Sequence, residues 1–222
     1  YHLRERWSAD MASSYFGGPE DDYEAVNAND NFRNDENVYD GSGQFWSETK
    51  RLLSRQNPFT NAADHIDIAN IVDFMLLWVS GNSESEFRAF GSEPRGIPFK
   101  FMIKDADGFL RSPGHSANHA GPYSVMSRMR SGVDSDEYSI MLADRIHKHF
   151  FNNGALTPSK NIQRLERRVD EARLGFISEA ARWGNLFREP TSWESYQNNL
   201  LNNHFPGLTK TMIGRFKSAG MY

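Results

Sequence analysis

The sequence predicts an α+β fold that is mostly α, with a small β-sheet inserted beside its first core helix. Two patterns lead to this prediction. Apolar residues recur with helical spacing over residues 67–79 and again from Asp136 almost to the C-terminus. In contrast, Phe99, Phe101 and Ile103 lie at alternate positions over residues 99–103, as in a half-buried strand. With 222 residues, the chain is long enough for one substantial domain, and we expect a single domain over 1–222.

Composition excludes several classes of function. The formal net charge is −4 with both signs interspersed, which argues against a nucleic-acid polymer as partner. Polar residues interrupt the most apolar stretch, residues 66–79, so we expect no membrane span. The absence of cysteine excludes disulfides and thiolate metal sites, and it is compatible with an exported bacterial protein. Because the chain begins at Tyr1 without a signal peptide, we expect a processed form or a fragment.

The first half of the chain is predicted to alternate between polar segments and short elements. Residues 1–6 read as an isolated strand, and residues 17–45 as a long polar excursion with little core. A helix is expected from about Gln44 to Ser54. Asp67 then looks like the N-cap of a second helix. Its inward face would carry six apolar residues: Ile68, Ile71, Val72, Met75, Leu76 and Val79.

Two strands and four helices follow. The strands are expected at 84–90 and 99–103, joined by a Gly- and Pro-rich turn over 91–98. Residues 136–222 form the helical C-terminal portion, with helices predicted at 136–152, 161–187, 192–203 and 209–218. The first of these helices would gather five apolar residues on one face: Ile140, Met141, Leu142, Ile146 and Phe150.

Two acidic segments flank the predicted pair of strands. Glu84 and Glu86 lie at the start of the first strand, and Asp105 and Asp107 follow the second, where Gly108 lets the chain turn. Carboxylates at i and i+2 near a strand end can converge on a hard cation such as Mg²⁺. Two alternatives remain open. The aspartates can cap backbone amides in a turn, and the glutamates can lie on a solvated edge-strand face.

Four stretches of the chain resemble the CotH family of atypical, spore-coat-type kinases. Tyr1-His-Leu-Arg-Glu5 resembles a strand of that family, and residues 64–74 resemble the helix that precedes its catalytic loop. Gly81-Asn82-Ser83-Glu84 stands where the family shows a G-N-x-D or S-N-x-D turn, and residues 101–107 match its strand ending in D-x-D. The C-terminal helices, with Ala180-Ala-Arg-Trp183, are similar to those of large secreted or surface members.

This resemblance implies a helical protein-kinase-like C-terminal lobe. The activity implied is phosphoryl transfer from ATP, with Mg²⁺ or Mn²⁺, to Ser or Thr of an exported protein at the bacterial surface or outside the cell. Carried over by position, Asp105 would be the catalytic aspartate that binds the metal on the ATP phosphates, and Asp107 would support it. Glu84 would be the residue beside the acceptor hydroxyl, and Asn82 would fix its loop. Glu86 or Arg88 falls near the place of the family's metal-ligand asparagine, and Glu86 would be the candidate metal ligand.

The chain departs from the family at two points. Glutamate stands at position 84 where the family has aspartate, which moves the carboxylate by roughly an ångström. The nucleotide-clamping lobe should precede Tyr1, so we expect the chain alone to be a poor kinase. The alternative is a catalytically degenerate scaffold, a pseudokinase or binding module of a larger surface protein. Residues 17–45 and 115–119 would then contact a partner. Metal-dependent phosphodiester cleavage by the acidic cluster is a third possibility.

Other polar clusters have simpler interpretations. His115 and His119 lie among Gly, Pro and Ser without a third ligand, so a substrate or activation-like loop is favoured over a zinc site. His147 and His149 are expected to be surface or packing residues. The arginines of residues 164–173 alternate with acidic residues, and pairs within the helix explain them.

Overall fold

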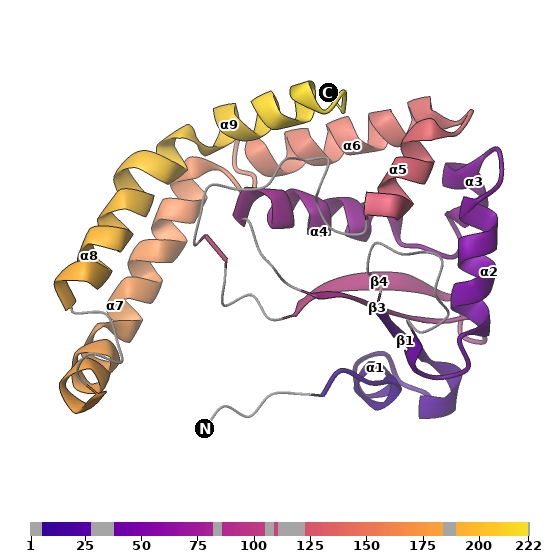
Figure 1. Cartoon of the computed structure of the whole chain (residues 1–222), viewed down its shortest axis with the longest axis horizontal. Coiled ribbons are helices and arrows are strands. Elements are labelled where there is room, and N and C mark those ends of the chain that lie inside the picture. The colour runs from indigo at the N-terminus through magenta and orange to yellow at the C-terminus, as the bar shows by residue number, and fades with distance from the viewer. Residues whose placement is uncertain are drawn as a thin grey trace. The chain divides into compact units, whose positions relative to one another are not determined.

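The computed structural model describes residues 6–27, 38–81, 86–104, 109–110, 123–183 and 190–221. Most of these residues are helical, and the strands form one antiparallel sheet in the order β2-β1-β3-β4 (Figure 1). The predicted α+β, mostly α fold is therefore confirmed. The chain divides into two compact units: unit 1 comprises residues 1–145 with 221–222, and unit 2 comprises residues 146–220.

Unit 1 contains the sheet and the helices that cover it. In chain order its elements are α1 (Ala9–Phe16), the 3₁₀-helix η1 (Glu20–Asp22), β1 (Glu24–Asn27), β2 (Val38–Asp40), α2 (Gln44–Leu53), α3 (Pro58–Ala62), α4 (Ile68–Gly81), β3 (Glu86–Ser92), β4 (Ile97–Lys104), α5 (Tyr123–Ser131) and most of α6 (Ser135–Phe150). The described elements of unit 2 are helical: α7 (Pro158–Trp183), α8 (Pro190–Asn199), the π-helix η6 (Leu200–His204) and α9 (Phe205–Ser218). None of the helices within the described ranges has both the length and the low polarity needed to cross a membrane.

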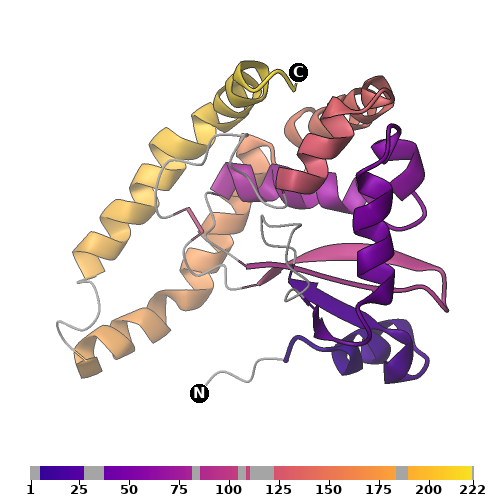
Figure 2. The same ribbon diagram turned by 45° about the vertical axis from the view of Figure 1, so that its right-hand side comes forward.

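The sheet carries a helical layer on each face (Figures 1 and 2). On one face, Phe90 of β3 contacts Trp7 just before α1, with ring centroids 5.3 Å apart. On the other face, Phe101 of β4 contacts Phe74 of α4, with centroids 6.1 Å apart. This arrangement follows from the two-residue period of a strand, which sends alternate side chains to opposite layers.

The expectation of little core over residues 17–45 is wrong. Tyr23, Ala25 and Val26 are fully buried, and β1 is an interior strand paired with both β2 and β3. The apolar residues of 23–26 form only a short run among Gly, Asp, Asn and Glu. The polar composition of the whole segment therefore hid the strand pattern. Of the strand predicted at 1–6, only Arg6 is described, and it lies outside the strands.

Helix α2 begins at Gln44, as predicted, and it begins against a buried carboxylate. Glu24 of β1 is only 5% exposed. Its two oxygens accept hydrogen bonds from the backbone N–H groups of Phe45 (3.0 Å) and Trp46 (2.9 Å), and from the Ser42 hydroxyl (2.8 Å). A carboxylate at this position satisfies N–H groups that have no partner within the helix and interacts favourably with the helix dipole. Glu24 thus joins the sheet to α2.

Helix α4 also forms as predicted. Asp67 caps its first turn by accepting a hydrogen bond from the N–H of Asn70 at 2.9 Å. All six residues predicted to face inward are buried, and Phe74 and Trp78 are buried as well. The helix is therefore apolar over most of its circumference.

The predicted hairpin is confirmed, although β3 at 86–92 ends two residues later than predicted and β4 at 97–104 is longer than predicted. Phe99 and Phe101 are buried, in accord with the predicted alternation. The connecting turn is narrower than the predicted 91–98 and is described as residues 93–96. Gly96 has a φ of 62° in this turn, a conformation that favours glycine.

The C-terminal helices differ from the prediction in two respects. Ile140 is 64% exposed, so the buried face of α6 is formed by Tyr138, Leu142, Ile146 and Phe150 instead. The predicted break between 203 and 209 is absent: α8, the π-helix and α9 follow one another without interruption. Pro206 lies in the first turn of α9, where a missing N–H costs little.

Candidate functional site

Most of the predicted site residues fall in two short segments outside the described residues. Asn82 and Glu84 belong to segment 82–85, and Asp105 and Asp107 belong to segment 105–108. Glu86 is the first residue of β3, and only its backbone is described. The structure describes the residues on either side of both segments, and these residues fix the points at which each segment leaves and rejoins the described chain.

Both acidic segments join the same end of the hairpin. Segment 82–85 leads directly into Glu86, and segment 105–108 follows directly after Lys104. Glu86 and Lys104 are opposite partners in the antiparallel pairing of β3 with β4. Opposite residues in such a pair have Cα atoms roughly 4.5–5.5 Å apart. The two acidic segments therefore connect to the sheet at neighbouring points.

The other ends of the two segments also meet. Segment 82–85 begins at Gly81, the last residue of α4. The N–H of Leu110, shortly after segment 105–108, donates a hydrogen bond to the carbonyl oxygen of Gly81 at 2.5 Å. The ring of Phe109 lies so close that a Cβ on Gly81 would be 1.8 Å from it. Glycine at position 81 thus allows the chain after the D-x-D segment to return to the end of α4.

The outer edge of β4 is closed by residues that lead into α4. The Phe99 N–H donates to the carbonyl oxygen of His65 (2.7 Å), and the Asp67 N–H donates to the carbonyl oxygen of Phe99 (3.1 Å). Asn70 continues this pairing through its side chain. Its Oδ1 accepts from the Phe101 N–H at 2.6 Å, and its Nδ2 donates to the Phe101 carbonyl oxygen at 3.2 Å. An edge strand with its polar groups satisfied in this way is held in register and protected from pairing with another chain.

Asn70 is a positioning residue that sequence reasoning missed. The sequence suggested only that it interrupts an apolar stretch. The feature of the sequence that could have indicated this role is a side-chain amide next to Ile71, a residue predicted to face inward. A partly buried amide needs partners, and Asn70 finds them in the strand that leads to Asp105.

The charged residues around α4 are engaged in ion pairs. The Lys100 Nζ lies 2.5 Å from Asp67 Oδ2. Burial raises the pKa of Asp67, whereas the Lys100 ammonium group and the Asn70 N–H lower it. The lowering effects together are larger, so the pKa of Asp67 is below its ordinary value. Arg145 of α6 forms an ion pair with Asp73. These pairs bind α4 to its neighbours within unit 1.

Arg88 is the second of the two residues that the resemblance to the CotH family suggested near a metal-ligand position. Its guanidinium carbon is 5.4 Å from the centre of the Tyr39 ring, and the residue is buried. This cation–π contact joins β3 to β2 across the sheet. Of the two residues near that position, Glu86 is therefore the better candidate for a metal ligand.

The donor set proposed for the metal consists of carboxylates, which suit Mg²⁺ and Mn²⁺. Elsewhere in the described ranges, no group of three or more His, Asp or Glu side chains is arranged to hold a metal ion. His115 and His119 lie outside the described residues. His147 stacks on Phe151 at 5.5 Å, in keeping with its predicted packing role.

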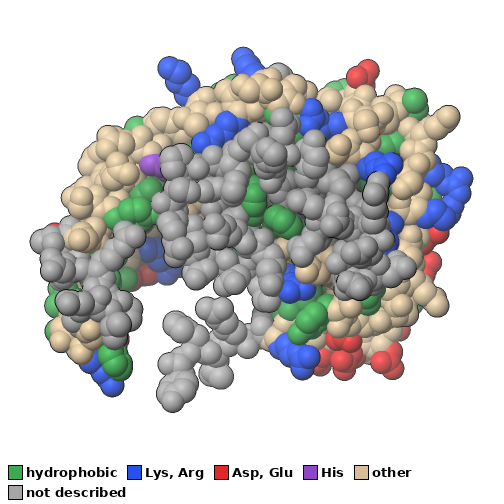
Figure 3. Space-filling model, in the orientation of Figure 1, with side chains coloured by type: hydrophobic (Ala, Val, Ile, Leu, Met, Phe, Trp, Pro, Cys, Tyr) green, Lys and Arg blue, Asp and Glu red, His purple; other side chains and the backbone are tan. Residues whose placement is uncertain are grey.

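A polar hollow in unit 1 bears on the alternative of a binding module. It has a volume of about 510 Å³ and is lined by Arg6, Ser8, Asp10, Met11, Ser14, Glu20, Tyr39 and Asp40. Figure 3 shows acidic side chains gathered at the lower right of the face shown. The 3₁₀-helix η1, which supplies Glu20 to the hollow, consists of three consecutive acidic residues. Residues of the predicted polar excursion thus line part of a surface hollow with charges of both signs.

Comparison of the chain with models of known protein families, with curated proteins and with solved structures gives no match.

Proposed function

We propose that this chain carries the metal- and nucleotide-binding part of a CotH-type atypical kinase, which transfers phosphate from ATP to Ser or Thr of an exported protein. The observation that supports the proposal is the shared anchoring of the two acidic segments. They leave the sheet at the paired residues Glu86 and Lys104, and they meet again at Gly81 and Leu110.

The order of elements supports the same proposal. A helix, α4, is followed by segment 82–85, then by the β3–β4 hairpin and then by segment 105–108. In protein kinases the catalytic loop precedes the D-F-G segment, whose aspartate binds Mg²⁺. Here the residues in the corresponding places are Glu84 and Asp105. Phosphoryl transfer depends mainly on positioning and charge neutralisation, and short segments anchored at both ends are suited to positioning.

Each site residue has a distinct role in this proposal. Asp105, Asp107 and Glu86 would hold the divalent cation, which neutralises the phosphate charge when bound. Glu84 orients the acceptor hydroxyl and accepts its proton late in the transfer. Asn82 holds the loop that carries Glu84 by hydrogen bonds of its side chain.

Thermal unfolding with Mn²⁺ and ATP tests the proposal. A ligand that binds only the folded state, present at a hundred times its Kd, stabilises that state by about 2.7 kcal/mol. For a chain of this size, the melting temperature should rise by roughly 5–10 °C. Asp105→Asn removes a carboxylate from the donor set and should abolish the rise.

The matched control is Asp21→Asn, which removes an exposed carboxylate from η1. This variant should retain the full rise in melting temperature. No rise in the unaltered chain, or an equal rise in Asp105→Asn, would count against a nucleotide–metal site and favour the degenerate scaffold.

A further inference from the structure

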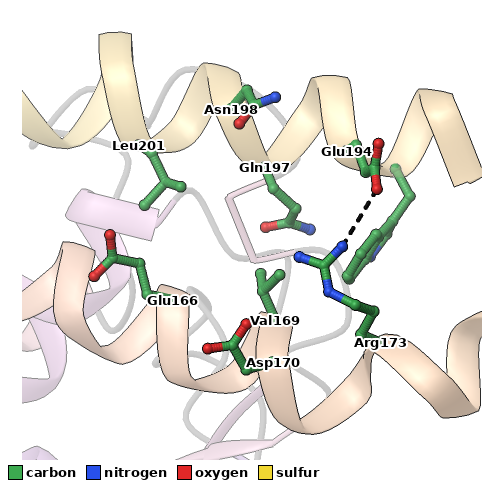
Figure 4. Close-up of a pocket in the computed structure, with 9 residues that line it drawn as sticks. Glu166, Val169, Asp170, Arg173, Glu194, Gln197, Asn198 and Leu201 are labelled. Atoms are coloured by element: carbon green, nitrogen blue, oxygen red, sulfur yellow. Dashed lines mark hydrogen bonds and ion pairs between the residues drawn. The ribbon is translucent and has the colours of Figure 1, made fainter.

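Unit 2 contains a surface groove between α7 and α8 (Figure 4). Its volume is about 430 Å³. The side chains that line it are Glu166, Val169, Asp170, Arg173, Trp193, Glu194, Gln197, Asn198 and Leu201. These residues come from α7, from α8 alongside it and, for Leu201, from the π-helix η6, so the groove is a feature of the fold rather than of one loop.

The groove has an excess of negative charge. Three carboxylates line it, against the single guanidinium of Arg173. Arg173 was predicted to pair within α7, but it forms an ion pair with Glu194 of α8 at 3.4 Å, across one end of the groove. Glu166 and Asp170, four residues apart on α7, have no ion-pair partner among the residues that the structure describes. Two uncompensated carboxylates therefore lie together on one helix face.

The floor of the groove is apolar and contains one unsatisfied acceptor. Val169 and Leu201 are partly buried there, whereas Glu166 and Asp170 are exposed at the rim. In Figure 4 the Gln197 side chain extends from α8 toward α7. Its Oε1 atom is buried and receives no hydrogen bond from any described residue. Buried carbonyl oxygens usually have a donor partner, so this atom is an unsatisfied acceptor beneath the floor of the groove.

We propose that this groove binds a basic segment of a partner protein. A Lys or Arg side chain fits its chemistry, because such a side chain combines an apolar stem with a cationic head. The stem would lie on Val169 and Leu201, and the head would donate hydrogen bonds to Glu166 and Asp170. Guanidinium and ammonium groups supply only donors, which is what this set of acceptors needs.

A protein segment fits the groove better than a small free cation. Exposed ion pairs contribute little individually, because water and salt screen them. The rim carboxylates are exposed, so a lone cation would gain little from them. A segment adds apolar contacts along the floor and can reach the aromatic end, where Trp193 stacks on Phe176 at 4.7 Å.

This inference goes beyond the proposed kinase function. The groove is formed by residues 166–201 of unit 2, whereas the acidic segments belong to unit 1. Failure of the nucleotide site would leave the groove and its test unaffected.

Fluorescence anisotropy with a defined probe tests the inference. The probe is a fluorescein-labelled peptide Gly-Leu-Arg-Leu-Lys-Leu-Gly, titrated with the full chain at low salt. The groove variant is Glu166→Gln with Asp170→Asn. The matched control is Glu137→Gln with Glu179→Gln, which removes two exposed carboxylates outside the groove. The groove variant should bind the peptide roughly tenfold more weakly than the unaltered chain, and the control variant should bind it within twofold.

Three results would overturn the proposal. The first is that the unaltered chain does not bind the peptide. The second is that both variants lose affinity equally, because an equal loss indicates attraction by net charge alone. Spermine provides the third test: if it binds the groove as tightly as the peptide and shows the same loss in the groove variant, the site is one for small polyamines.

Discussion

Replacing Glu24 by alanine should lower the free energy of unfolding by about 3–5 kcal/mol, as measured by urea denaturation followed by circular dichroism. The Glu24 carboxylate accepts two backbone hydrogen bonds at the start of α2 and one from Ser42. Its removal leaves the N–H groups of Phe45 and Trp46 without their partner in a buried environment, and each such group costs roughly 1–3 kcal/mol. The favourable interaction with the helix dipole is lost as well.

Glu20→Ala is the control for this change. Glu20 is an exposed acidic residue in η1, four positions before Glu24. Its removal should alter stability by less than about 0.5 kcal/mol. A loss below about 1 kcal/mol for Glu24→Ala would contradict the role given to this carboxylate.

Asn70→Ala should lower the free energy of unfolding by about 2–3 kcal/mol. The Asn70 amide satisfies both backbone groups of Phe101 on the outer edge of β4. Alanine removes both bonds, although it gains a few tenths of a kcal/mol in helix propensity. Amide hydrogen exchange gives a local measurement, because the Phe101 N–H should lose its protection in this variant.

The control for Asn70→Ala is Asn61→Ala, an asparagine of α3 in the same unit. It should leave the exchange of the Phe101 N–H unchanged. Continued protection of that N–H in Asn70→Ala would show that the side chain does not hold the edge of β4.

The sequence predicted the elements whose patterns are strong and local. Helix α4 was recognisable because Asp67 caps a run of apolar residues with helical spacing, and every residue predicted to face inward is buried. The β3–β4 hairpin was recognisable because Phe99, Phe101 and Ile103 lie at alternate positions and a Gly- and Pro-containing turn precedes them. Such periodicities depend only on neighbours in the chain.

The missed features depend on contacts between distant residues. Glu24 lies 22 positions from Trp46, whose N–H donates a hydrogen bond to it, and Asn70 lies 31 positions from Phe101. Contacts between residues so far apart in the chain leave no pattern in the local sequence from which they could be predicted. The continuity of α8 with α9 was missed because Pro206 and Gly207 resemble a helix break, although proline is well tolerated in a first helical turn.

The candidate site was predicted from its motif, and its local surroundings come from the structure. The sequence identified Glu84, Glu86, Asp105 and Asp107 as a group of carboxylates. The pairing of Glu86 with Lys104 brings the two acidic segments to one end of the hairpin. The binding of metal and nucleotide stays a prediction.

A double-mutant cycle on the affinity for Mn²⁺ and ATP tests most directly that the two acidic segments form one site. Isothermal titration would give Kd for the unaltered chain, Glu86→Gln, Asp105→Asn and the double variant. If both carboxylates bind one cation, the two losses should fall short of additivity, with a coupling energy of at least about 1 kcal/mol. Strictly additive losses, or an unaltered chain that does not bind Mn²⁺ with ATP, would contradict the account.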